Sequence, residues 1–180
     1  ASLDLNTRHA ILMDEVHKQW KVESAILWLV NEASQTLSPY FAAQQQSANG
    51  GTPKHAFPLG RGLVGKVAQS GRASFANDAP HHPDYNADID KITGGLIKSV
   101  ACAPLIVHER VIGVLALYNK EEGTFAEEDI KRLQGFANLA ATAVLNARLF
   151  AESEQEREIV RATAETLSQP LMILSENGEV

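Results

Sequence analysis

The chain has 180 residues, 44% of them hydrophobic, and this length favours one globular domain with extensions over two full domains. Sixteen basic against 22 acidic residues give a formal net charge of -6 at pH 7, and no cluster of Lys or Arg interleaved with aromatics stands out. We therefore expect no nucleic acid among its partners.

Two further exclusions concern membranes and disulfides. No apolar run approaches the ~18 residues of a membrane span, and the N-terminus lacks the charged-then-apolar order of a secretion signal, so we expect a soluble, cytoplasmic protein. The lone cysteine, Cys102, rules out an internal disulfide and fits a reducing compartment. Its apolar surroundings, SVACAPLIV, predict a buried, unreactive thiol.

The first part of the chain predicts a helix followed by a hairpin. Apolar residues recur at helical spacing from Leu5 to Trp20, which indicates an opening helix. Ser24–Val30 (SAILWLV) is a continuous apolar run, and the turn NEASQ returns the chain into TLSPYFAAQ, so two antiparallel strands are expected. The polar QQQSANGGTP that follows is predicted to be a surface loop.

Four glycines, Gly60, Gly62, Gly65 and Gly71, frame a short helix predicted over Leu63–Ser70. The run GRGLVGK fits the pattern G-x-G-x-x-G, but no clear strand precedes it and its lysine lacks a following Ser or Thr. A dinucleotide or phosphate loop is therefore not expected. The glycines are interpreted as tight boundaries of the short helix.

The middle of the chain predicts an irregular segment and a second hairpin. A brief strand in ASFAND ends at Asp78, and the turn-rich stretch after it holds a helical turn at about Asn86–Lys91. Two strong strands follow, KSVACAPLIV and VIGVLALYN. Because only the polar HER joins them, they are predicted to pair as a hairpin.

The last segment predicts one long helix. Thr124 and Glu127 have the spacing of a capping box, and no proline follows until Pro170. Past Phe150 the composition is highly charged, so a partner helix is the expected support. LMILSENGEV, after the proline, predicts the first strand and turn of a further domain. The apolar positions of the long helix alternate by three and four, as in a helix–helix seam: Ile130, Leu133, Ala137, Ala140, Val144, Ala147 and Ala151.

The order of these elements predicts an α+β fold. An antiparallel sheet would carry the N- and C-terminal helices on one face, while the short helix and the irregular loop roof the other face, where a small molecule can be enclosed. We expect a globular domain over residues 1–150, a charged helical linker over 151–169 and the start of a truncated following domain over 170–180.

Several motifs then occur together in one order. They are GLVG, Asn-Asp after the third strand, HPDYN with D and TG beyond it, PLIV followed by VIGVL, and Asn-Lys ahead of Phe-x-x-x-Asp. With them, the stretch from about Val22 to Phe150 resembles a GAF domain of the subset found in cyclic-nucleotide phosphodiesterases and bacterial sensor cyclases and kinases. The resemblance implies a GAF-like sheet and a sensory role, as in two-component systems.

GAF domains of that subset carry a motif of Asn, Lys, Phe, Asp and Glu. Asn119, Lys120, Phe125 and Asp129 match it, and Ile130 stands where the family has Glu. The resemblance implies that the Lys and the Asp pair and close the sheet edge against the last helix. The helix dipole favours a carboxylate in the first turn, so we expect Lys120 to reach Asp129, with Phe125 beneath them. We name these four matching residues the strand-to-helix clamp.

By the same resemblance, a ligand pocket lies between the sheet and the loop HHPDYNADIDKITG. Amide, carboxylate and hydroxyl groups there can hydrogen-bond a ligand, and Tyr85 offers an aromatic plate. Ordinary turn, core and helix-stop roles are the alternatives for these residues. The expected pocket residues are Ser24, Ile26, Val64, Ala76, Asn77, Asp78, Tyr85, Ile89, Thr93 and Ser99.

His81 and His82 raise the question of a metal or a haem. Adjacent histidines in a Pro-rich loop point in different directions, and no carboxylate at helical spacing orients them, so surface positions and no metal site are expected. No cysteine adjoins them. This argues against the covalent tetrapyrrole attachment of related photoreceptor GAF domains.

These features together predict a sensory module and not an enzyme. No Ser-His-Asp or paired-carboxylate arrangement can be assembled, and the free-methionine-sulfoxide reductases of this fold depend on several cysteines. We expect a small-molecule ligand, with a cyclic nucleotide as one candidate and no certain cofactor. A homodimer through the Leu5–Trp20 and Ile130–Leu167 helices would pass the signal to an output domain in the same chain. The alternative is a ligand-free dimerisation and spacer module. The sequence leaves open the ligand, the output domain and the direction of the effect.

Overall fold

The computed structural model describes residues 2–44, 56–90 and 96–176, with side chains placed in 11–40, 56–90 and 96–167. It divides into two compact units, Ala1–Ala143 and Val144–Val180. Unit 1 holds the sheet, and the described part of unit 2 is the continuation of helix α4 (Glu127–Glu176). The predicted division at residues 150 and 170 stays a prediction.

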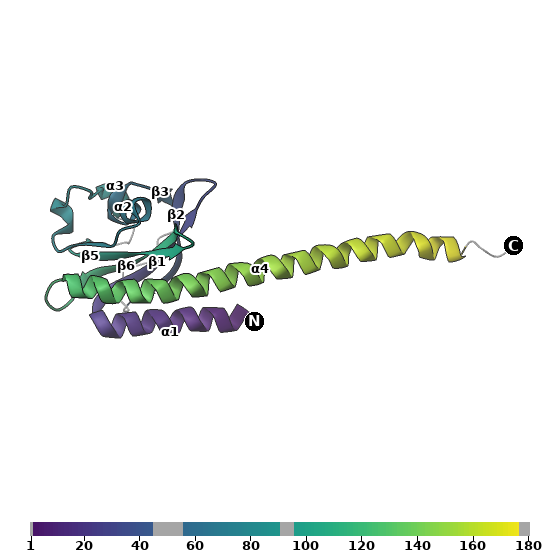
Figure 1. Cartoon of the computed structure of the whole chain (residues 1–180), viewed down its shortest axis with the longest axis horizontal. Coiled ribbons are helices and arrows are strands. Elements are labelled where there is room, and N and C mark those ends of the chain that lie inside the picture. Colours follow the sequence, from purple (N-terminus) through teal and green to yellow (C-terminus); the bar gives the residue numbers. More distant parts are fainter. Residues whose placement is uncertain (1, 45–55, 91–95, 177–180) are drawn as a thin grey trace. The chain divides into compact units, whose positions relative to one another are not determined.

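Unit 1 is built on a six-stranded antiparallel sheet in the order β3-β2-β1-β6-β5-β4 (Figure 1). Both predicted hairpins are present, since β1 pairs with β2 and β5 with β6. The pairing of β1 with β6 joins the two hairpins into one sheet. The strands are β1 (Val22–Asn31), β2 (Thr36–Gln44), β3 (Phe57–Pro58), β4 (Ser74–Ala76), β5 (Val100–Val107) and β6 (Arg110–Lys120).

The predicted helices are also present, with two differences in α4. They are α1 (Ser2–Trp20), α2 (Gly62–Ser70), α3 (Ala87–Asp90) and α4, with the short 3-10 helix η1 (Ala79–His81) before α3. Because α4 begins at Glu127, the residue before it is Ala126, and the predicted capping box starting at Thr124 lies two residues too early. Nor does a strand begin after Pro170, because α4 continues to Glu176.

Helices cover both faces of the sheet, which confirms the α+β prediction. In Figure 1, α1 and the first turns of α4 lie on one face, and α2 and α3 lie on the other. Side chains alternate along a strand, so Leu115 and Leu117 of β6 face α1 and α4 while Ala116 faces α2. On the α1 side, Trp20 meets Phe136 edge to face, with ring centroids 5.3 Å apart.

The apolar seam predicted on α4 is buried within this chain in its first turns. Leu133, Ala137 and Ala140 are fully buried within a single chain. The three-four spacing fits packing inside the domain as well as it fits a partner helix. Any partner must therefore use another face of α4.

The sheet face under α2 carries a continuous apolar cluster. Trp28 lies at its centre, donating its Nε1–H to the Tyr118 hydroxyl at 3.1 Å and meeting Phe57 edge to face at 5.0 Å between centroids. Cys102 is buried in this cluster, as predicted. The two glycines that bound α2, Gly62 and Gly71, have φ of 71° and 66°, so they serve as tight helix boundaries.

Candidate ligand-binding site

The strand-to-helix clamp forms as the sequence predicted. Lys120 Nζ lies 2.8 Å from Asp129 Oδ2, and each of the two side chains is only 17% exposed. Lys120 also donates to the Thr124 carbonyl at 3.0 Å and lies 5.4 Å from the centroid of the buried Phe125 ring. The end of β6 is thus fixed to the first turn of α4.

Asp129 also caps α4. Its Oδ2 accepts the backbone N–H of Ala126 at 3.0 Å, which satisfies one of the free amide groups at the helix N-terminus. Burial acts to raise the pKa of Asp129, but the hydrogen bonds from Lys120 and Ala126 and the Lys120 charge outweigh it and lower that pKa below its usual range. The carboxylate form is therefore favoured in the folded protein.

Asn119, the first clamp residue, holds the chain that leads into β5. Its Oδ1 accepts backbone N–H groups from Lys98 at 2.7 Å and Ser99 at 3.3 Å, and its Nδ2 donates to the Leu96 carbonyl at 2.9 Å. Nδ2 also donates to Glu23 on β1 at 2.7 Å. Asn119 has φ of 55°, a conformation that Asn tolerates better than most residues.

The chain between β4 and β5, described over residues 77–90 and 96–99, is named the roof segment here. The start and the end of this segment both contact the clamp. At the first end, the Asn77 side chain donates to the Phe125 carbonyl at 2.9 Å and accepts the Phe125 N–H at 2.8 Å. At the other end, besides the Asn119 bonds, Ser99 Oγ accepts the Lys120 N–H at 3.1 Å. Asn77 and Ser99, both expected in the pocket, thus bond to the clamp.

The other expected pocket residues are spread over several environments. Ile26, Val64 and Ala76 belong to the apolar cluster, and Tyr85 and Ile89 are half-buried against it. Ser24 is half-buried on β1, and Asp78 is exposed. Thr93 lies outside the described residues.

The two histidines differ from the expectation in one respect each. His81 does have a carboxylate at helical spacing, since its Nδ1 lies 2.8 Å from Asp78 Oδ1, and this hydrogen bond raises the pKa of His81. His82 is half-buried instead of exposed. Within residues 2–44, 56–90 and 96–176, no group of three or more His, Cys, Asp or Glu side chains could hold a metal ion.

A cleft of about 440 Å³ opens between α2, β4, β5 and the roof segment, and it is named the α2–β4 cleft here. Its volume lies within the range of roughly 300–1,000 Å³ that small-molecule sites occupy. Of the residues expected from the sequence, only Ala76 lines it. The lining consists of Leu63, Lys66, Val67, Gln69, Ser70, Arg72, Ala73, Ser74, Phe75, Ala76, His82, Asp84, Val100 and Cys102.

Sequence reasoning missed the polar residues of this cleft. Lys66, Gln69 and Ser70 recur at a spacing that puts them on one side of α2, which is a detectable signal. Nothing in the sequence shows that this side meets β4 and the turn at His82. The α2–β4 cleft therefore became visible only in the tertiary structure.

One ion pair links α2 to the roof segment across the cleft. Lys66 Nζ lies 3.8 Å from Asp84 Oδ1, with about half of each side chain exposed. The backbone N–H of Asp84 donates to His82 Nδ1 at 3.2 Å. In the neutral ring the proton is then on Nε2, so His82 offers a hydrogen-bond donor. On the apolar side of the cleft, burial raises the pKa of the Cys102 thiol.

A buried carboxylate fixes the roof segment to α2. Asp90 is 5% exposed, and its Oδ1 accepts the Leu63 N–H at 3.2 Å while its Oδ2 accepts the Asn86 N–H at 2.7 Å. It thereby caps two helices at once. Burial raises the pKa of Asp90, and the two backbone hydrogen bonds only partly oppose it. No local pattern in the sequence singles out this residue.

This fold and clamp define a GAF-type module, and comparison with known proteins agrees. The family model described as GAF domain matches residues 3–145. The chain therefore belongs to the GAF domain family, whose members are small-molecule-binding regulatory modules of signalling proteins.

Individual relatives place the chain within this family. It is 35% identical over 114 residues to the dual 3',5'-cyclic-AMP and -GMP phosphodiesterase 11A of Takifugu rubripes, a match that covers 62% of this chain and 13% of that protein. The chain spans only 13–15% of the length of the curated relatives it matches.

Solved structures share the fold. The GAF domain of a phosphoenolpyruvate-protein phosphotransferase from Coxiella burnetii has a TM-score of 0.67 and 18% identity, covering 78% of this chain and 82% of that one. The free methionine-R-sulfoxide reductase from Neisseria meningitidis has a TM-score of 0.61 and 23% identity, covering 74% of each chain. At these identities the likeness concerns the fold alone. In the described part of this chain, no helix has the length and apolarity to cross a membrane.

Proposed function

We propose that the chain is a sensory module that binds a small molecule in the α2–β4 cleft and passes the event to α4. The observation that carries this proposal is that both ends of the roof segment are hydrogen-bonded to the clamp, through Asn77 at one end and Asn119 at the other. The clamp in turn fixes the first turn of α4. A change in the roof segment therefore bears directly on the start of that helix.

The coupling is a shift between conformations. A ligand in the cleft meets His82 and Asp84 of the roof segment and Lys66 of α2, so it favours whichever roof conformation makes the better contacts. Asn77 then transmits that preference to Phe125, next to Asp129. The expected outcome is a rotation or register change of α4.

Cyclic nucleotides are the first ligands to test, because relatives of this chain are named as cyclic-nucleotide phosphodiesterases. Hydrogen exchange is measured with and without cyclic GMP and cyclic AMP, together with thermal unfolding. Binding predicts a saturable rise in melting temperature and slower exchange at residues 77–90 and at the start of α4. A ligand that stabilises the fold but leaves exchange at α4 unchanged would contradict the coupling.

The signal requires a partner for α4, and we propose a homodimer through α1 and α4 that leads to an output domain in the same chain. Apolar side chains remain exposed along α4, including Leu139, Phe150, Val160 and Leu167. Their positions fit a three-four repeat on a face different from the buried one. Analytical ultracentrifugation at micromolar concentration should show a dimer that Val160→Glu dissociates, whereas Gln155→Glu, on the opposite side of α4, should leave it intact.

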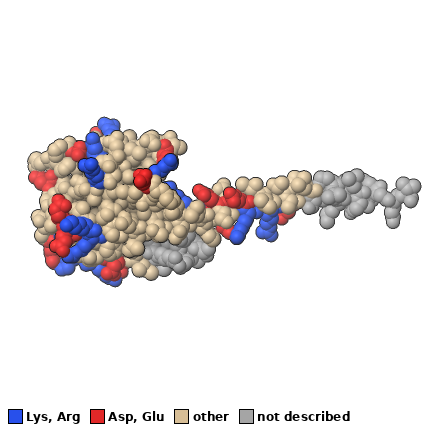
Figure 2. All heavy atoms as spheres, in the orientation of Figure 1, with Lys and Arg blue, Asp and Glu red and all other residues tan. Residues whose placement is uncertain are grey.

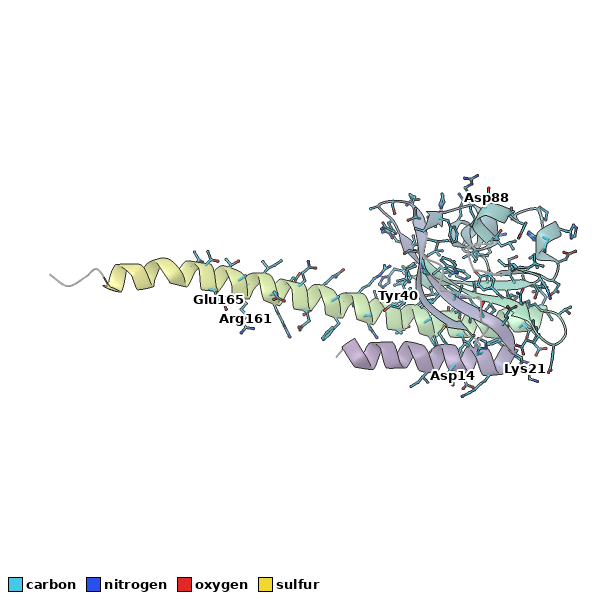
Figure 3. All side chains as sticks on the ribbon, turned by 180° about the vertical axis from the view of Figure 1, so that it is seen from behind. Asp14, Lys21, Tyr40, Asp88, Arg161 and Glu165 are labelled. Carbon is cyan, nitrogen blue, oxygen red and sulfur yellow. The ribbon has the colours of Figure 1, made fainter. Side chains whose placement is uncertain are left out.

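The charged part of α4 has few stabilising contacts of its own. Figure 2 shows basic and acidic side chains mixed along this stretch, and Arg161 and Glu165, labelled in Figure 3, form a pair one turn apart at 3.8 Å. Such exposed pairs contribute little. This supports a partner helix over an isolated one.

The competing function is a ligand-free dimerisation and spacer module, and the apolar cluster between the sheet and α2 favours it. The thermal-shift screen separates the two, since a spacer dimerises without stabilisation by any metabolite. Catalysis is not proposed, because the chain has one cysteine and that thiol is buried with a raised pKa. Incubation with thiols and free methionine sulfoxide should show no turnover.

A further inference from the structure

We infer that the α2–β4 cleft takes a small amphiphilic anion, with the negative group at Arg72 and the apolar body against Val67 and Val100. This assignment rests on the proposed function, because it names the class of ligand for the same site. It follows from the charges, the hydrogen-bonding groups and the apolar surface that the cleft brings together.

The polar lining of the cleft has more donors than acceptors. Its charged residues are Lys66, Arg72 and Asp84, so two positive groups face one negative group. His82 contributes an Nε2–H donor, since its Nδ1 already accepts the Asp84 N–H. An anion satisfies this surplus, and a cationic ligand does not.

Arg72 is the available cation. Its backbone N–H donates to Ser70 Oγ at 3.3 Å, but its guanidinium makes no ion pair with any of the described residues. Lys66 is already held by Asp84, although at 3.8 Å their separation is longer than a direct hydrogen bond. A guanidinium offers two parallel donors to a carboxylate or a phosphate, which gives it a geometric preference for such groups.

The other side of the cleft is apolar. Leu63, Val67 and Val100 form its buried wall, and the half-buried Phe75 of β4 exposes apolar surface beside them. A simple inorganic ion would leave this surface without a partner. A ligand with a flat or aliphatic body buries it instead, which adds a hydrophobic contribution to the charge contact.

The test uses two fluorescent probes that share one apolar body. The probe 8-anilinonaphthalene-1-sulfonate carries a sulfonate, and N-phenyl-1-naphthylamine is the same molecule without it. Both are titrated into the wild-type chain, into Arg72→Gln and into Arg132→Gln. Arg132 is the matched control, because it is an exposed arginine of α4 that pairs with Glu128 at 3.2 Å and does not line the cleft. Circular dichroism checks that all three proteins are folded.

The expected result is tighter binding of the sulfonate than of the neutral probe. Arg72→Gln should weaken the sulfonate about tenfold, since one charge-assisted hydrogen bond is lost, and leave the neutral probe unchanged. Arg132→Gln should change neither. Equal affinity for the two probes, no binding of the sulfonate, or an unchanged affinity in Arg72→Gln would each overturn the assignment.

Competition identifies the kind of anion. Displacement of the sulfonate by cyclic GMP indicates a phosphodiester ligand, displacement by 1-naphthoate indicates a carboxylate, and displacement by neither contradicts an anion site. Hydrogen exchange separates the two proposals. If the anion binds through Arg72 but exchange at α4 is unchanged, the ligand class stands and the sensory coupling fails. If a ligand alters exchange at α4 with the same affinity in Arg72→Gln, the coupling stands and the ligand class fails.

Discussion

Replacing Lys120 with Met tests the clamp, because it keeps a side chain of similar length and removes the charge. In the wild type the ammonium donates to Asp129 at 2.8 Å and to the Thr124 carbonyl at 3.0 Å, and it lies 5.4 Å from the Phe125 ring centroid. The substitution leaves a mostly buried carboxylate with hydrogen bonds from the Ala126 N–H and the Trp20 side chain. The cost is therefore mainly that of an uncompensated charge.

The magnitude follows from the burial. The two side chains are 17% exposed, so the pair lies between an exposed pair, worth about 0–1 kcal/mol, and a buried pair, whose disruption costs about 3–5 kcal/mol. We expect Lys120→Met to lower the free energy of unfolding by about 2 kcal/mol, which for a chain of this size lowers the melting temperature by about 4–8 °C.

Urea unfolding followed by circular dichroism measures this loss. Lys131→Met is the control, because Lys131 is an exposed residue of α4 near the clamp. A double-mutant cycle with Asp129→Asn should give a coupling energy of at least about 1 kcal/mol. Equal losses in Lys120→Met and Lys131→Met, or no coupling to Asp129, would refute the reasoning.

Three further predictions concern the clamp and the roof segment. Asn119→Ala should lower the free energy of unfolding by about 3 kcal/mol, because backbone groups lose their hydrogen-bond partners and φ stays at 55°. Asn119→Gly should lower it by about 1 kcal/mol less, because glycine adopts this φ without strain. Equal losses of the two variants in urea unfolding would contradict this. The native pKa of Asp129 is lowered, so the contribution of Asp129 to stability is present above about pH 4 and is lost as the pH falls through the native pKa. On acidification, the free energy of unfolding of the wild type should therefore fall more steeply than that of Asp129→Asn. Asp90 has a raised native pKa, so the folded state binds its proton more tightly than the unfolded state does. The contribution of Asp90 to stability should therefore decline as the pH rises from about 4. In urea unfolding across pH 4–6, Asp90→Asn should lack this decline, and parallel stability curves of wild type and variant would rule it out.

The family resemblance implied the Lys120–Asp129 pair, and the short separation of the two residues in sequence supports it. Lys120 ends a strand and Asp129 begins a helix nine residues later, so the loop between them restricts where the two side chains can meet. The bonds from Asn77 to Phe125 span 48 residues, and no local pattern shows them. The sequence therefore predicts Asn77 as a pocket residue, whereas its amide bonds the Phe125 backbone in the clamp.

The cleft could not be predicted for a related reason. Lys66 is on α2, Arg72 follows that helix, and Asp84 is in a turn-rich stretch whose path the sequence does not define. The buried Asp90 was missed because a carboxylate in a polar stretch is usually exposed. Both features depend on how α2 and α3 are placed over the sheet.

By itself the sequence determined the helices and both hairpins, because hydrophobic period and turn residues act over a few residues, and the family motif in it implied the Lys120–Asp129 pair. Only the tertiary structure decided that β1 joins β6, that the apolar stripe of Leu133 and Ala137 is buried within the chain itself, and that Arg72 opens onto a cleft. A pattern defines which face of a helix or strand is apolar. Packing decides what that face meets, since many partners satisfy the same pattern.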